Sequence, residues 1–186
     1  YPRYGNFKRV NIDSTQATNF ANWYSYYRTR INSMKTAVGL SFRTIDSGKR
    51  VGFITINPGS PVMASRYLAV NDFNQTQKNS FYQKLYSQIP NSSTPLRQAL
   101  SRVGRYFGGK KDGINSGMND DPLQYSCQQN FAILSTDGYW NGNAGQTLGG
   151  ATLGNVDNVN AGYSSRAYGA YDGGLTGASG TLSDVA

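Results

Sequence analysis

The chain has 186 residues and a formal net charge of +8, and 38% of its residues are hydrophobic. This length is sufficient for one domain with a sizeable core, and no stretch approaches the roughly 20 apolar residues of a membrane span. The chain contains one Cys, no His and no Glu, which excludes ordinary zinc, haem or copper ligation and any nucleophile activated by His. Oxygen atoms of Asp, Ser and Thr remain for a metal, and they suit Mg²⁺ or Ca²⁺.

The charge is unevenly distributed. Residues 1–111 contain 17 Lys and Arg and 3 Asp, a balance of +14, whereas residues 112–186 contain Arg166 and 7 Asp, a balance of −6. A basic first part is typical of a protein that meets nucleic acid or another anionic surface. Solvated helices give the same pattern, so the charge alone leaves both interpretations open.

The first predicted element is a helix over residues 19–39, ended by Gly39. Apolar side chains recur there at steps of three and four residues, which is the spacing of a core-facing helix: Phe20, Trp23, Tyr24, Tyr27, Ile31, Met34 and Val38. The stretch "YSYYRTR" mixes aromatic residues with Arg, as a helix facing nucleic acid or lipid does. Its aromatic residues fall on the apolar stripe, which favours packing.

A strand, two helices and a second strand are predicted to follow. The stretch "RVGFITIN" (50–57) is rich in β-formers and closes at a Pro-Gly turn. The next helix covers about residues 72–89, with one apolar side: Phe73, Phe81, Leu85 and Ile89. In "TPLRQALSRVGRYF", Thr94 is the predicted N-cap and Pro95 the first helical residue. Core spacing continues through that helix to Gly108-Gly109, with Leu96, Leu100, Val103 and Phe107.

The second strand is predicted at "FAIL" (131–134), and it stops at "STDG" with Asp137 at its tip. Both strands are continuous apolar runs, so we expect an α/β fold whose parallel sheet is covered on both faces. After Gly142 the chain is rich in Gly, Ala, Asn and Ser, which predicts a long surface loop or a disordered segment. The expected organisation is therefore a core over 1–141 and a Gly-rich region over 142–186.

Two residues are candidates for a binding edge. Ligands of open α/β sheets bind at the carboxyl ends of the strands, where Asp137 lies. Thr94 opens a helix after a Ser-rich turn, so its hydroxyl could face the same crevice. A hydroxyl with a carboxylate suits a hard cation, but Thr-Pro and Asp-Gly are also common cap and turn sequences. The pair Asp120-Asp121 is interpreted as loop. Cys127 is either a buried thiol or half of a disulfide to a residue outside the chain.

Three blocks of sequence, in this order, carry a resemblance: "NFANWYSYYRTRINSMKTAVG", "STPLRQALSRVGRYF" and "YSCQQNFAILSTDGYWN". They resemble the type IV pilus biogenesis and tip-associated adhesin family, the PilY/PilC proteins, in its N-terminal von Willebrand factor A-like region. The resemblance implies a three-layer α/β/α, Rossmann-type domain. It also implies that the chain is a fragment lacking the first strand, and that the closing "TLSDVA" starts a further helix.

The resemblance further implies a metal-ion-dependent adhesion site. In that site a threonine before a helix and an aspartate after a strand map onto Thr94 and Asp137, and a D-x-S-x-S motif on the first strand completes the ligands. The nearest match in this chain supplies Asp13 and Thr15 but lacks the last hydroxyl, so the motif is expected to precede Tyr1. In an oxidising periplasm, Cys127 would pair with an upstream cysteine.

The function implied is a non-enzymatic adhesion and assembly module at the pilus tip or outer membrane, secreted through the periplasm. It would hold Mg²⁺ or Ca²⁺ and serve surface attachment and twitching motility. The expected partners are pilin or minor pilin subunits, host or abiotic surfaces, and the remainder of the same polypeptide. The alternative is a basic domain that binds nucleic acid or another anionic polymer.

Overall fold

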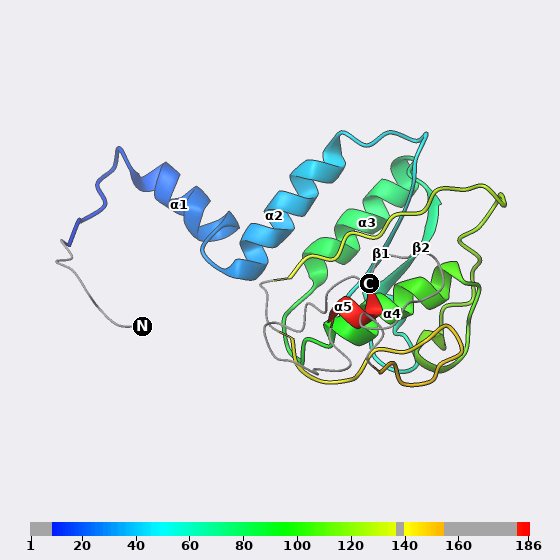
Figure 1. Ribbon diagram of the computed structural model, residues 1–186. Coiled ribbons are helices and arrows are strands. Elements are labelled where there is room, and N and C mark those ends of the chain that lie inside the picture. The colour runs from blue at the N-terminus through cyan, green and yellow to red at the C-terminus, as the bar shows by residue number, and fades with distance from the viewer. Residues whose placement is uncertain (1–8, 137–139, 155–181) are drawn as a thin grey trace, which may run out of the picture. The chain divides into compact units, whose positions relative to one another are not determined.

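The computed structural model describes residues 9–136, 140–154 and 182–186 (Figure 1). The chain divides into two compact units, Tyr1–Arg43 and Thr44–Ala186. The first unit contains α1 (Ala17–Tyr26) and α2 (Arg30–Arg43). The second contains the remaining elements: β1 (Arg50–Ile54), η1 (Ala64–Arg66), β2 (Tyr67–Asp72), α3 (Gln75–Ser87), α4 (Leu96–Phe107), η2 (Gly113–Asn115) and α5 (Leu182–Val185). The expected boundary after residue 141 stays a prediction.

The first unit is a pair of helices, so the prediction of one continuous helix over 19–39 is wrong. The helix is interrupted at residues 27–29 because side chains of α2 fold back and cap the end of α1. Three of them donate to the last carbonyl groups of that helix, which have no intrahelical partner: Asn32 Nδ2 to Ser25 O (3.0 Å), Thr36 Oγ1 to Tyr26 O (3.0 Å) and Ser33 Oγ to Tyr27 O (2.9 Å).

The aromatic side chains of α1 are exposed, which corrects their predicted place in the core. α1 has no buried residue, and in α2 the buried residue is Gly39. Four aromatic residues on the predicted stripe are 42–49% exposed: Phe20, Trp23, Tyr24 and Tyr27. Polar side chains of α2 hydrogen-bond to the end of α1, while the aromatic rings of α1 stay about half exposed.

The second unit is built on a β-hairpin. β1 pairs antiparallel with β2, from Arg50 opposite Asp72 to Ile54 opposite Tyr67, with an irregularity between Val51 and Phe53. The parallel sheet was predicted for residues 50–57 and 131–134, and this antiparallel pair was not part of that prediction. Parallel pairing requires a crossover connection, usually a helix, whereas here the chain reverses through turns and the short η1. β2 was not predicted from the sequence.

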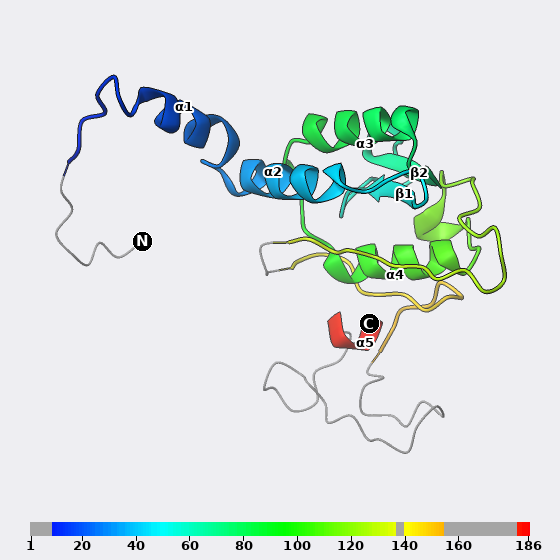
Figure 2. The same ribbon diagram turned by 90° about the horizontal axis from the view of Figure 1, so that it is seen from above.

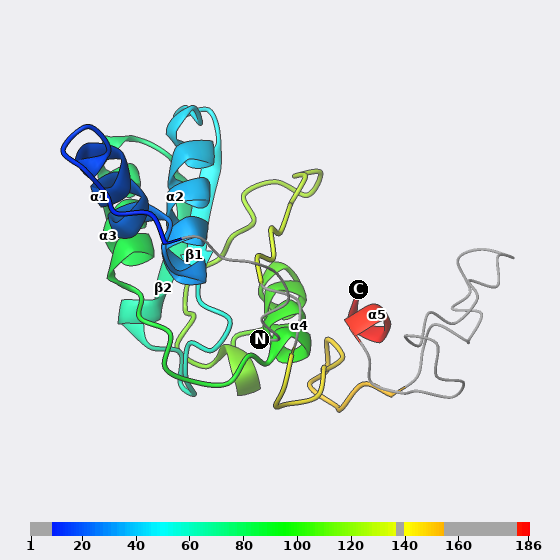
Figure 3. The ribbon, with the colours of Figure 1, turned by 90° about the vertical axis from the view of Figure 1, so that its left-hand side faces the viewer.

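Two helices cover opposite faces of the hairpin, as Figures 2 and 3 show for α3 and α4. On the α3 face, Phe81 packs edge-on against Phe53 (6.0 Å between ring centroids) and Phe73 (5.6 Å). Gln77 also donates from Nε2 to a carbonyl of each strand, at 2.8 Å. On the α4 face, Tyr106 belongs to a cluster with Val62, Met118, Ile54, Tyr67 and Val70. The mixed α/β class is confirmed: a two-stranded β-hairpin lies between α3 and α4.

The two predicted helices of this unit are present with shifted ends. α3 begins after Asn74, whose side chain accepts from Gln77 N, and buries Phe81 and Leu85 as expected. Ile89 lies beyond its end and is exposed, so its predicted core position is wrong. α4 ends at Gly108 as predicted, but Pro95, not Thr94, is its N-cap residue.

Residues 131–134 do not form the predicted strand. Phe131 and Ile133 are 81% and 80% exposed, and the backbone groups of residues 131–135 form no hydrogen bond with another described residue. An apolar run becomes a strand only where a neighbouring backbone pairs with it. In the part of the chain described here, residues 131–135 have no such neighbour.

The described part of the Gly-rich region, residues 142–154, is a loop as predicted, and α4 holds its backbone. Arg105 is 1% exposed and donates to Leu148 O (2.5 Å), while Ser101 Oγ accepts from Gln146 N (2.8 Å). A segment rich in glycine is thus fixed through its peptide groups. The closing residues form the short helix α5, as expected. No helix within the described ranges has the length and apolar character needed to cross a membrane.

Candidate functional site

Thr94, one of the two principal predicted site residues, is held against the segment that follows Asp137. Thr94 N donates to Asn141 Oδ1 (2.8 Å), and Asn141 N donates to Thr94 O (3.1 Å). These two bonds engage both backbone groups of Thr94, one residue before the N-cap Pro95. Asp137 itself lies outside the described residues. The structure therefore brings Thr94 beside residue 141, four positions after Asp137 along the chain.

The loop before Thr94 carries further hydroxyl groups, and the segment after β1 holds it. Asn57 Nδ2 donates to Ser92 Oγ (3.0 Å) and Ser93 Oγ (3.2 Å). Arg66 fixes the same region, donating to Asn57 O (2.7 Å) and weakly to Asn91 Oδ1 (3.4 Å). Sequence analysis missed both Asn57 and Asn141. Their signal was an Asn directly after an apolar or aromatic run, where amide side chains commonly stabilise turns.

The chemistry of this hydroxyl loop, residues 91–94 with Asn57 and Asn141, is that of neutral oxygen donors. Such oxygens are suitable secondary ligands for Mg²⁺ or Ca²⁺, which also require carboxylate charge. The charged side chains bonded around this loop are cationic: Arg66 donates to Asn57 O (2.7 Å), and Arg97 donates to Gly142 O (3.0 Å). A cation would therefore depend on Asp137 for its charge balance. No three His, Cys, Asp or Glu side chains come together among the described residues.

The two additional metal candidates form a local turn before α1. Asp13 Oδ1 accepts from Thr15 Oγ1 (2.6 Å), Thr15 N (2.8 Å) and Gln16 N (3.2 Å). The hydrogen bond from the Thr15 hydroxyl is the main reason that the pKa of Asp13 lies below its ordinary value. Both side chains thus already bond to each other in this turn.

Cys127 is exposed with a free thiol, so the buried-thiol interpretation is wrong. Pairing with a cysteine outside the chain stays a prediction. The reason for its exposure is the irregular loop around it, which follows Pro122 and precedes the exposed residues 131–134.

Asp120, predicted to be ordinary loop, is the acceptor of a tyrosine pair. Tyr67 donates to Asp120 Oδ1 and Tyr106 donates to Oδ2, and Tyr106 Oη also accepts from Val70 N (3.3 Å). Burial, followed by the bond to Asp120, raises the pKa of Tyr106 to about 12 and raises that of Tyr67 still further. This tyrosine–aspartate cluster ties the loop after η2 to both β2 and α4.

A narrow cavity of about 60 Å³ lies between the end of β1, with the residues that follow it, and residues 132–134. It is lined by residues 54–56, by Ala99, Leu100 and Val103 of α4, and by residues 132–134. Within the described chain, β1 is hydrogen-bonded along one edge, to β2. Thr55 Oγ1, which borders this cavity, is buried without a hydrogen-bond partner among the described residues. Among the described residues, the cavity thus lies beside a strand that has one unpaired edge.

Comparison with known proteins gives one group of relatives. Proteins named Type IV pilus biogenesis factor PilY1 match from Pseudomonas aeruginosa strains PAK (34% identity over 167 residues, 82% of this chain), PAO1 (34% over 169 residues, 82%) and UCBPP-PA14 (35% over 152 residues, 80%). The chain spans 12–14% of the length of these relatives. No family model and no solved structure matches it. The similarity, which extends over at least 80% of the chain, shows that it belongs to the PilY1-like type IV pilus biogenesis factors.

Proposed function

We propose that this chain is part of a type IV pilus assembly and adhesion module that acts at the cell surface without catalysis. The name of its relatives supports a role in pilus biogenesis. The structural observation that supports the proposal is the pair of hydrogen bonds between Thr94 and Asn141, which fixes a hydroxyl-rich loop beside residue 141, four positions after Asp137 along the chain. Its partners would be pilin subunits and host or abiotic surfaces.

The proposed binding edge holds Mg²⁺ or Ca²⁺ through Thr94 and Asp137. Hard cations take oxygen ligands, and the cation would supply an open coordination position to a carboxylate on the partner. Ser92 and Ser93 lie on the same loop and offer further hydroxyl oxygens. Asp13 and Thr15 are secondary candidates. Because Arg97 places a positive charge close to this edge, binding depends strongly on the carboxylate of Asp137.

We also infer that a strand from outside the described residues inserts between β1 and residues 131–134, which would have to move apart to admit it, since the cavity there is only about 60 Å³. The support is threefold: among the described residues, one edge of β1, the backbone of residues 131–135 and the Thr55 hydroxyl have no hydrogen-bond partner. With this strand, the hairpin and the apolar run would form one sheet between α3 and α4, as in the three-layer domain. The end of the added strand would lie near the hydroxyl loop, where it could supply the missing ligands.

Cation binding is tested by thermal unfolding of this chain and of a longer polypeptide that includes the upstream residues. A cation at one hundred times its dissociation constant stabilises the folded state by about 2.7 kcal/mol, and Asp137→Asn should remove this stabilisation in the longer polypeptide. Asp121→Asn, which changes an exposed loop carboxylate, is the matched control and should retain it.

Adhesion is tested on the same variants by capture on immobilised pilin subunits, with and without EDTA. We expect capture to fall with EDTA and with Asp137→Asn. If neither Mg²⁺ nor Ca²⁺ shifts the unfolding of either polypeptide, the metal site is contradicted. If capture persists in EDTA, the assembly role survives without it.

A further inference from the structure

The helix pair of the first unit combines positive charge with a lack of acidic side chains. Residues 14–43 contain four cationic residues and no Asp or Glu: Arg28, Arg30, Lys35 and Arg43. All four lie on α2 or on the turn that precedes it. A segment of this composition attracts polyanions, because neutralising phosphate groups releases their condensed counterions.

The preceding helix carries exposed aromatic rings on one face. Phe20, Trp23 and Tyr24 are spaced as i, i+3 and i+4, which places them side by side on α1. Tyr27 is the first residue after this helix, and each of the four is 42–49% exposed. The ring centroids of Phe20 and Trp23 are 5.7 Å apart, and those of Phe20 and Tyr24 are 6.0 Å apart. The rings therefore form a continuous surface on which planar groups could stack.

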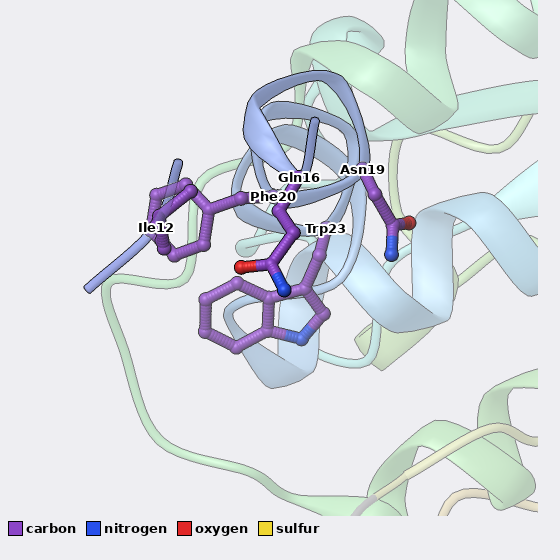
Figure 4. Close-up of a pocket in the computed structure, with 5 residues that line it drawn as sticks. All are labelled: Ile12, Gln16, Asn19, Phe20 and Trp23. Atoms are coloured by element: carbon purple, nitrogen blue, oxygen red, sulfur yellow. The ribbon is translucent and has the colours of Figure 1, made fainter. Parts of the chain in front are cut away.

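A shallow pocket of about 310 Å³ opens at the start of this face, lined by Ile12, Gln16, Asn19, Phe20 and Trp23 (Figure 4). Its volume lies at the low end of ligand pockets, which are about 300–1,000 Å³. Figure 4 shows the carboxamide of Gln16 between the rings of Phe20 and Trp23. Carboxamides offer both donors and acceptors, as the edges of nucleobases do.

Positive charge directly adjoins the aromatic face. The guanidinium carbon of Arg28 lies 4.2 Å from the ring centroid of Tyr24, so a cation lies directly over one of the aromatic rings. Proteins that bind single-stranded nucleic acid combine these two components: basic side chains follow the backbone, and aromatic rings stack on successive bases.

We propose that the α1–α2 surface, consisting of the aromatic face of α1 with Arg28 and Arg30, binds single-stranded nucleic acid. The aromatic face requires unstacked bases, which a duplex does not offer, so binding favours single strands. The neutral pocket receives one base, and the arginines contact the flanking phosphates. This proposal uses no residue of the hydroxyl loop and is independent of the proposed cation site.

The test is fluorescence anisotropy of the 186-residue chain with a labelled oligothymidine of about 20 nucleotides. A duplex of the same length and a uronic acid polymer serve as competitors. We expect binding that weakens steeply with salt, with a slope of log K against log [salt] of about −0.7 for each phosphate neutralised. Arg28→Ala and Arg30→Ala should each reduce that slope by about 0.7. Trp23→Ala should weaken binding about tenfold, whereas Trp23→Phe, which keeps a stacking ring, should lose much less.

Matched controls come from the second unit. Lys49→Ala lowers the net charge by the same single unit, and Tyr86→Ala removes an exposed aromatic ring from α3. Neither should change the slope or the affinity appreciably, and circular dichroism checks that every variant keeps its helices. The proposal is overturned if the oligothymidine does not bind at low salt, if Trp23→Ala and Tyr86→Ala behave alike, or if the duplex or the uronic acid polymer competes as well as the single strand.

Discussion

Aromatic side chains are used in opposite ways in the two units of this chain. In residues 44–186, Phe73 and Phe81 are 1% and 2% exposed, whereas Phe20 and Trp23 of α1 are 42% and 48% exposed. α3 packs its rings against a hairpin that brings Phe53 to the same place. α1 meets α2 through hydrogen bonds to its carbonyl groups. Apolar periodicity thus identifies the face of a helix that is built for contact, but it does not show whether the covering surface belongs to the same unit.

The largest expected effect is the loss of stability when the buried ring of Phe81 is removed. Phe81→Ala should lower the free energy of unfolding by about 3–5 kcal/mol, because it leaves a cavity between α3 and the hairpin. The matched change Phe20→Ala should lower it by no more than about 0.5 kcal/mol, as for an exposed surface residue. Urea unfolding followed by circular dichroism measures both. Equal costs for the two variants would contradict the contrast between the units.

The next effect concerns the tyrosine–aspartate cluster. Asp120→Asn should cost about 1–3 kcal/mol, because an amide has one acceptor oxygen where two tyrosine hydroxyls each need one. Asp121→Asn is the control: its side chain accepts from Leu123 N through one oxygen that the amide retains. Urea unfolding at pH 7 compares the two. An Asp120 variant as stable as the Asp121 variant would show that the cluster does not hold the loop.

The same cluster predicts a loss of stability at alkaline pH. Burial raises the pKa of Tyr106 to about 12, while a tyrosine in the unfolded chain loses its proton near pH 10. Between these values the unfolded state binds fewer protons than the folded state, so the free energy of unfolding falls as pH rises. The contribution is complete below pH 10. Tyr106→Phe should make the decline between pH 10 and 12 shallower, and an unchanged slope would rule out this origin.

Sequence reasoning located most helices because their signals are local. Gly108 ends α4 as predicted, and the apolar spacing of Phe81 and Leu85 identifies the buried side of α3. The split between α1 and α2 was not predictable, since it depends on whether polar side chains of the second helix turn back to cap the first. β2 was not predicted because a strand this short has a weak sequence pattern and is defined mainly by its pairing with β1.

The candidate site was predictable only in part, because it depends on contacts between distant segments. Thr94 was identified as a helix-start residue, but its anchor, Asn141, lies 47 residues further on. Likewise, the link from Asn57 to Ser92 crosses 35 residues. Hydrogen bonds of this kind leave no periodic pattern in the sequence. The structure places Thr94 beside Asn141, and the pairing of Thr94 with Asp137 stays a prediction.

The smallest expected effect in this chain tests the open place beside β1. Ile133→Ser should change the free energy of unfolding of the 186-residue chain by about 0.5 kcal/mol or less, because this side chain is 80% exposed. If a further strand fills the cavity in a longer polypeptide, the same substitution there should cost about 2–4 kcal/mol, as for a buried aliphatic residue. Amide hydrogen exchange of residues 131–135 should slow at the same time, since a paired strand protects its N–H groups.

The control is Met63→Ser, which changes another exposed apolar side chain of this unit and should cost little in both polypeptides. If Ile133→Ser and the exchange rates are the same in both, no strand enters there, and residues 131–134 are a surface loop.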